Sequence, residues 1–193
     1  MSTEHEEVVV ADSGAWRVWL DEHESDSDGV WLVLAKKGVV TPTALTYAEA
    51  LEEALCSGWI DGQRRGRDAT TFLQRFTPRR RTSLWSQRNI GLVAGLTAEG
   101  RMRSRGQAEI ERARADGRWE RAYAGPASIE VPDDLTAALT LAPAAAALFA
   151  RLDSRNRYAV LHRIVTAPNA ITRANRLEKL VGMLERGEVP YPT

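Results

Sequence analysis

The chain has 193 residues, of which 26 are basic, 26 are acidic and 44% are apolar. This composition is typical of a globular protein with one domain or two closely packed subdomains. The chain has no apolar run of the about 18 residues that a membrane span needs, and its acidic first residues lack the basic and apolar regions of a signal peptide. We therefore expect a cytoplasmic protein without stable membrane insertion.

The metal-ligating and nucleophilic side chains are few and scattered. The single cysteine is Cys56, and the histidines are His5, His23 and His162. They do not have the spacing of a zinc site, and the chain has neither a dinucleotide-binding glycine motif nor a phosphate-binding loop, so we expect no metal and no cofactor. A nucleophilic Cys56 is disfavoured, because it lies at the predicted C-terminal end of a helix, where partial negative charge opposes a thiolate.

The zero net charge hides a strong asymmetry along the chain. Residues 1–60 carry 3 basic and 12 acidic side chains, residues 61–118 carry 14 and 6, and residues 119–193 carry 9 and 8. This distribution indicates either pairing between the first two segments or a positive surface that faces an anionic partner. Because the basic residues of the middle segment alternate with apolar ones, they cannot all face one partner, and we expect no nucleic-acid binding.

Strand and helix patterns alternate at the start of the chain. Residues 6–10 are predicted to form a short strand, and Asp12 or Ser13 to cap the helix that follows it. The apolar run at residues 30–35 predicts a strand buried on both faces.

A capping-box pattern then marks the start of a second helix. In this pattern Thr46 and Glu49 satisfy each other's free backbone donors, and the helix is predicted to continue to about Ser57. Gly58 takes the left-handed position that ends it.

Two further strands are predicted at residues 58–65 and 69–76, with Asp61-Gly62 and Gly66 in turns. A helix is predicted to begin at Ser83 or Ser86. Another begins at Ser104 and ends before Gly117.

From residue 132 onward the sequence pattern is helical. The predicted helices are residues 132–141, 143–152, 154–166 and 169–186. The fold class is therefore α+β, with a small, largely antiparallel sheet and helices in the N-terminal half and an all-helical C-terminal half. We expect an N-terminal subdomain of residues 1–100 and a helical subdomain of residues 101–193, packed as one unit.

Two central motifs resemble the YdeI/OmpD-associated family, which is also labelled bacteriocin-protection. They are ALCSGWIDG at residues 54–62 and FTPRRRTSLWSQRN at residues 76–89. Further matching elements are the helix with Trp16 and Trp19, GVWLVLAKK, the segment Gly100-Arg101-Met102, and the C-terminal helix around Thr172, Arg173 and Arg176. The resemblance implies a role in antimicrobial tolerance. It implies no catalytic residues, because the family is named after resistance phenotypes and an outer-membrane association.

Asp61 is a candidate for chemistry. It directly follows Trp59 and Ile60, and apolar neighbours would raise its pKa and make it a general base. The alternative is an Asp-Gly turn, in which the side chain bonds its own backbone.

The segment of residues 79–89 combines arginine forks, hydroxyl groups and the free backbone donors of a helix start, which are the requirements of an anion site. The predicted ligand-binding residues are Trp59, Arg79, Ser83, Trp85, Ser86 and Asn89. In the alternative interpretation, Ser83 or Ser86 caps the helix, Trp85 packs in the core, and the arginines pair with the acidic first segment.

Three functions remain open from the sequence. The favoured one is a stress or antimicrobial-tolerance-associated binding protein with a pocket for a small anionic ligand or peptide. The second is an enzyme that acts on a small anionic substrate, with Asp61 as general base, and the third is a protein-interaction domain without a ligand. The first two require WIDG at residues 59–62 and PRRRTSLWS at residues 78–86 to meet in space, with Asp61 and Trp85 on the same side of the molecule.

Overall fold

The structure is a computed structural model that describes residues 7–192, so His5 and Glu6 lie outside the described residues. It divides into two compact units. The described part of the N-terminal unit comprises residues 7–83 and 89–120, and that of the C-terminal unit comprises residues 84–88 and 121–192.

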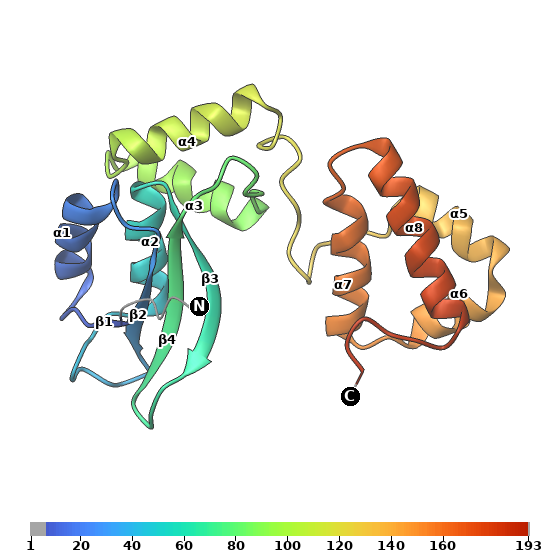
Figure 1. Cartoon of the computed structure of the whole chain (residues 1–193), viewed down its shortest axis with the longest axis horizontal. Coiled ribbons are helices and arrows are strands. Elements are labelled where there is room, and N and C mark those ends of the chain that lie inside the picture. The colour runs from blue at the N-terminus through green and yellow to red at the C-terminus, as the bar shows by residue number, and fades with distance from the viewer. Residues whose placement is uncertain (1–6, 193) are drawn as a thin grey trace. The chain divides into compact units, whose positions relative to one another are not determined.

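The N-terminal unit contains a four-stranded sheet. Its strands are β1 (Glu7–Val8), β2 (Val30–Ala35), β3 (Trp59–Gly66) and β4 (Thr71–Pro78). They lie in the order β1-β2-β4-β3 (Figure 1). Strands β1 and β2 pair in parallel, whereas β2–β4 and β3–β4 are antiparallel. The predicted α+β class with a largely antiparallel sheet is therefore confirmed.

Four helices accompany this sheet. They are α1 (Ser13–His23), α2 (Tyr47–Cys56), α3 (Gln87–Ala98) and α4 (Ser104–Ala115). The first two residues of α3 belong to the C-terminal unit. Helix α4 contacts α2 and belongs to the N-terminal unit.

The local signals in the sequence set the ends of the first two helices. The Asp12 carboxylate accepts a hydrogen bond from the backbone N–H of Ala15 at 2.9 Å and caps α1. Thr46 and Glu49 form the predicted capping box of α2, and Gly58 has the expected positive φ of 73°. Both caps are thus confirmed.

The core of the N-terminal unit is aromatic where α1 meets the sheet. The Trp16 ring is fully buried, and its indole N–H donates to the carbonyl oxygen of Ala50 at 3.2 Å. This ring stacks on Trp19 at 5.1 Å between centroids and meets the edge of Trp59 at 6.4 Å. It also contacts Phe76 of β4, with the centroids 5.8 Å apart. These contacts fix β3 and β4 against α1.

The Asp-Gly turn predicted at Asp61-Gly62 is wrong. Both residues lie inside β3, where Asp61 pairs with Phe76. The pairing with β4 shifts between Asp61 and Arg64, so the glycine accompanies an irregularity of the strand and not its end.

The acidic and basic segments of the chain pair with each other. The Arg101 and Arg103 guanidinium groups bind the two carboxylate oxygens of Glu53 at 2.8 and 2.9 Å. Arg103 also reaches Asp21 at 2.7 Å, and Arg67 binds Glu7 at 3.2 Å. Part of the positive charge of the middle segment is therefore neutralised within the N-terminal unit.

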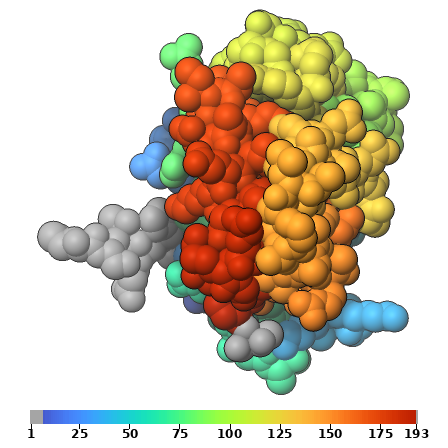
Figure 2. Space-filling view, turned by 90° about the vertical axis from the view of Figure 1, so that its right-hand side faces the viewer, coloured from blue at the N-terminus to red at the C-terminus, as the bar shows by residue number. Residues whose placement is uncertain are grey.

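The C-terminal unit is helical, with α5 (Asp133–Leu141), α6 (Pro143–Arg151), α7 (Ser154–Val165) and α8 (Ala170–Glu185). All four predicted helices are confirmed within two residues at either end. In the space-filling view, α8 lies beside α5 and α6 (Figure 2). Helix α8 contacts α5, α6 and α7.

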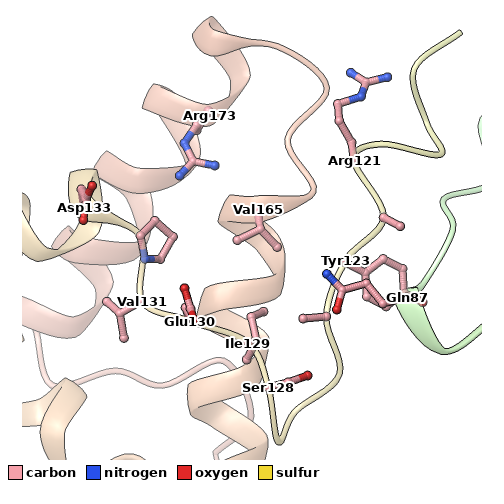
Figure 3. A pocket seen from close by; sticks show the side chains of 13 residues that line it. Gln87, Arg121, Tyr123, Ser128, Ile129, Glu130, Val131, Asp133, Val165 and Arg173 are labelled. Carbon is pink, nitrogen blue, oxygen red and sulfur yellow. The ribbon is translucent and has the colours of Figure 1, made fainter.

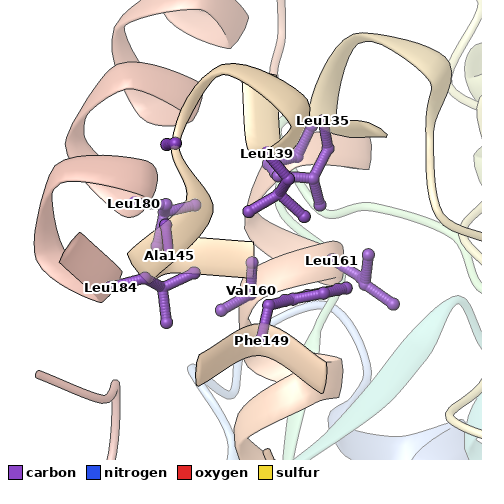
Figure 4. Close-up of a cluster of buried hydrophobic side chains, with 10 residues drawn as sticks. Leu135, Leu139, Ala145, Phe149, Val160, Leu161, Leu180 and Leu184 are labelled. Atoms are coloured by element: carbon purple, nitrogen blue, oxygen red, sulfur yellow. The ribbon is translucent and has the colours of Figure 1, made fainter. Parts of the chain in front are cut away.

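One apolar cluster holds these four helices together. Leu135 and Leu139 come from α5, Phe149 from α6, Val160 from α7 and Leu184 from α8 (Figure 4). All five side chains are buried, so each helix contributes apolar area to one common core.

Among residues 7–192, no helix is long and apolar enough to cross a membrane.

Candidate functional site

Two predicted site residues of the N-terminal unit, Trp59 and Arg79, lie at the start of β3 and directly after the end of β4. Trp59 of β3 pairs with Pro78 of β4, and the backbone N–H of Arg79 donates to the carbonyl oxygen of Gly58 at 3.0 Å. The two central motifs therefore lie side by side at these residues, whereas residues 84–88 of the second motif belong to the other unit. The Trp59, Arg79 and Asn89 side chains are buried.

Asp61 is half-buried on β3. Its carboxylate accepts a hydrogen bond from the Tyr47 hydroxyl at 2.8 Å, which fixes the orientation of the side chain. The general-base role of Asp61 stays a prediction.

The two serines have different surroundings. The Ser83 hydroxyl oxygen accepts from the backbone N–H of Arg80 at 2.9 Å and closes a turn, so Ser83 does not cap α3. Ser86 directly precedes α3, which begins at Gln87.

Trp85 and Ser86 belong to the C-terminal unit, whereas the other predicted site residues belong to the N-terminal unit. Trp85 is buried, and its carbonyl oxygen accepts from the backbone N–H of Tyr123 at 3.0 Å. The backbone N–H of Gln87 in turn donates to the carbonyl oxygen of Tyr123 at 2.9 Å. This pairing holds residues 84–88 along the segment that leads into α5. The ligand site predicted at these residues stays a prediction.

Cys56 is buried at the end of α2, and burial raises the pKa of its thiol to about 11, with the nearby Glu53 carboxylate adding to the shift. At pH 8 the folded chain therefore holds almost no thiolate. We expect a disulfide reagent such as dithionitrobenzoate to react roughly a hundredfold slower with the folded chain than with the chain in guanidinium chloride. Equal rates in the two states would show that the thiol is accessible and reactive.

A pocket opens in the C-terminal unit beside the segment that precedes α5, and we call it the loop pocket (Figure 3). Its volume is about 690 Å³, within the range of about 300–1,000 Å³ that small-ligand sites have. It is lined by Gln87, residues 121–124, residues 128–133, Val165 and Arg173.

Charged groups of both signs surround an apolar floor in the loop pocket. Ile129, Val131 and Val165 supply apolar side chains, while Arg173 and Glu130 supply opposite charges. In Figure 3 the Arg173 guanidinium lies above Val165, on the pocket side of α8.

The Arg173 guanidinium is held in place by its neighbours. It donates to both carboxylate oxygens of Asp134, at 2.6 and 2.9 Å, and to the carbonyl oxygen of Ile164 at 3.2 Å. Hydrogen bonding to Asp134 raises the pKa of Arg173, and hydrogen bonding to Arg173 lowers the pKa of Asp134. The arginine is therefore a fixed cation at the pocket wall.

The main chain beside the loop pocket is available for hydrogen bonding. Glu130 and Val131 lie in a stretch without helix or strand between Ile129 and α5. Within residues 7–192, their backbone N–H and C=O groups make no hydrogen bond to another main-chain group. Such groups can pair with an extended peptide.

Sequence reasoning did not find the loop pocket, because its residues come from three separate parts of the chain. The alternation of Ile129, Glu130 and Val131 before Pro132 was the available local signal, since it indicates an extended segment. Arg173 belongs to one of the elements that carry the family resemblance. Among residues 7–192, no group of three or more histidine, cysteine, aspartate or glutamate side chains could hold a metal ion.

Two family models match the chain. Residues 128–187, which include most of the loop pocket, match the family described as "Bacteriocin-protection, YdeI or OmpD-Associated", and this match supports the family resemblance seen in the sequence. The two central motifs that suggested it lie instead within residues 8–109, which match a second family model. No curated protein and no solved structure matches the chain. Because residues 8–109 are more than half of its 193 residues, the chain belongs to the family described as "Domain of unknown function (DUF8412)".

Proposed function

We propose that this protein binds a short peptide in the loop pocket and that this binding contributes to antimicrobial tolerance. The observation that carries the proposal is the main chain at Glu130 and Val131, which lies outside helices and strands and whose hydrogen-bonding groups pair with no other main-chain group among residues 7–192, beside an apolar floor. A peptide that lies along this segment satisfies those groups and buries alternate side chains in the pocket.

The charges around the pocket also suit a peptide. Arg173 provides a fixed cation for a carboxylate, and the exposed Glu130 and Asp133 provide anions for an amino or guanidinium group. A ligand with charges of both signs therefore finds a partner for each. The description of the family that matches residues 128–187 names bacteriocin protection, which supports a role in tolerance.

The test uses the full chain labelled with ¹⁵N and a peptic digest of serum albumin as a pool of short peptides. We expect the digest to shift the backbone amide signals of Ile129, Glu130 and Val131 in a saturable way. Absence of any shift at these amides at millimolar total peptide would overturn the proposal.

Two neighbouring tryptophan substitutions provide the matched comparison. Ser128 and Ala127 are both exposed, but only Ser128 lines the loop pocket. A Ser128→Trp side chain fills the pocket and should weaken peptide binding about tenfold or more, whereas Ala127→Trp should leave it within a factor of two. Bacteria that produce each variant, challenged with a panel of bacteriocins, would show whether tolerance follows peptide binding. Equal peptide affinity in the two variants would place the peptide elsewhere.

A further inference from the structure

One face of α7 carries basic and aromatic side chains at helical spacing. Arg155, Tyr158 and His162 follow each other at intervals of three and four residues and therefore lie on the same side of the helix. They line a second pocket of about 480 Å³, together with Pro126, Ser154, Ala159, Arg163 and Tyr191. We call it the Tyr191 pocket.

The side-chain amide of Asn156 fixes one wall of this pocket. Asn156 is buried, and its amide group donates to the carbonyl oxygen of Tyr191 at 3.3 Å. The amide oxygen of Asn156 accepts from the backbone N–H of Tyr191 at 2.8 Å. Because one side chain pairs with both backbone groups of Tyr191, the C-terminal segment is held against α7.

Two guanidinium groups flank the Tyr191 ring. Arg155 lies over the ring at 4.3 Å from its centroid, and Arg163 lies at 6.0 Å. Within residues 7–192, neither guanidinium group forms an ion pair or a hydrogen bond, and the lining of the pocket contains no carboxylate. The nearby Asp153 carboxylate is used as the cap of α7, where it accepts from the backbone N–H of Asn156 at 2.7 Å. Two cations beside an aromatic ring are thus left without a counter-ion in the described structure.

The opposite part of the pocket is aromatic and uncharged. The His162 ring meets the Tyr123 ring edge to face at 4.6 Å and the Tyr158 ring at 5.4 Å. Burial, followed by the charge of Arg176, lowers the pKa of His162, so its imidazole is neutral at neutral pH. The positive charge of the pocket therefore comes from Arg155 and Arg163.

We infer that the Tyr191 pocket is a binding site for a small aromatic anion, such as an aromatic carboxylate. The ring of the ligand packs against Tyr158, His162 and Tyr191, and its anionic group binds the guanidinium groups of Arg155 and Arg163. This site shares no lining residue with the loop pocket.

The test is a calorimetric titration of the full chain with three probes. We expect 2-naphthoate, which has both the ring and the charge, to bind about tenfold or more tightly than 2-naphthylmethylamine or cyclohexanecarboxylate. The amine reverses the charge and the third compound removes the aromatic ring. Equal binding of naphthoate and the amine, or no naphthoate binding at millimolar concentration, would overturn the inference.

Two arginines of α7 form a matched pair for locating the ligand. Arg155 and Arg157 each lie over an aromatic ring, at 4.3 Å from Tyr191 and 4.6 Å from Phe149, but only Arg155 lines the pocket. Arg155→Gln should weaken naphthoate binding about tenfold, and Arg157→Gln should leave it within a factor of two. Equal losses would mean that the ligand lies outside the Tyr191 pocket. Amide shifts at Tyr191, as opposed to Ile129, distinguish this site from the peptide site, so that each proposal can fail separately.

Discussion

Replacing Gly106 with alanine should destabilise the N-terminal unit by about 3 kcal/mol, although the same change in an exposed helix normally stabilises a protein. Gly106 is buried in α4 where this helix crosses the end of α2. A Cβ atom at this position would lie 2.1 Å from the carbonyl oxygen of Cys56 and 2.8 Å from its carbonyl carbon. Backbone atoms cannot move aside as a flexible side chain can, so the two helices must separate.

Gly95 of α3 is the matched control. It is also helical and belongs to the same unit, but a Cβ atom there would meet nothing within 4 Å. We expect Gly95→Ala to be neutral or to stabilise by up to about 1 kcal/mol, because alanine has the higher helix propensity. Urea unfolding followed by tryptophan fluorescence measures the free energy of unfolding of both variants, since five of the six tryptophans lie in the N-terminal unit. Shifts of equal size and sign would show that α4 does not pack closely on α2.

The contact at Gly106 illustrates what the sequence could not predict. Capping by Asp12 and by Thr46 with Glu49 depends on residues three positions apart, and the helix ends that these residues mark were predicted from the sequence. The approach of α4 to α2 depends instead on a single missing Cβ atom, fifty residues away from Cys56. No local pattern distinguishes this glycine from an exposed one such as Gly95.

The candidate sites show the same division between local and distant contacts. The stripe of Arg155, Tyr158 and His162 can be read from helical spacing alone, because all three residues belong to α7. Tyr191 completes that pocket only through its backbone pairing with Asn156, 35 residues earlier in the chain. Asp61 was expected in a turn, but pairing with β4 keeps it in a strand. In each case the deciding contact joins residues that are distant in sequence.

Replacing Glu53 with glutamine should also destabilise the N-terminal unit, by about 2 to 3 kcal/mol. The Glu53 carboxylate is buried on α2 and binds one guanidinium group with each oxygen, Arg101 at 2.8 Å and Arg103 at 2.9 Å. Glutamine keeps the shape of the side chain but places an amide N–H₂ group against one of these cations. This expected loss of unfolding free energy is smaller than the loss on breaking a fully buried ion pair. The reason is that the Arg101 and Arg103 side chains remain 35% and 17% exposed, so that water screens their charges.

Glu99 provides the control for this prediction, since it binds the same arginine in a different environment. Its carboxylate lies 3.3 Å from Arg101, but its side chain is 60% exposed. We therefore expect Glu99→Gln to cost less than about 0.5 kcal/mol, and added salt to reduce that small cost further. Urea unfolding of both variants at low and high salt provides the measurement. If Glu53→Gln and Glu99→Gln cost the same, burial of Glu53 does not decide the strength of this network, and the pairing of the acidic and basic segments is a surface feature.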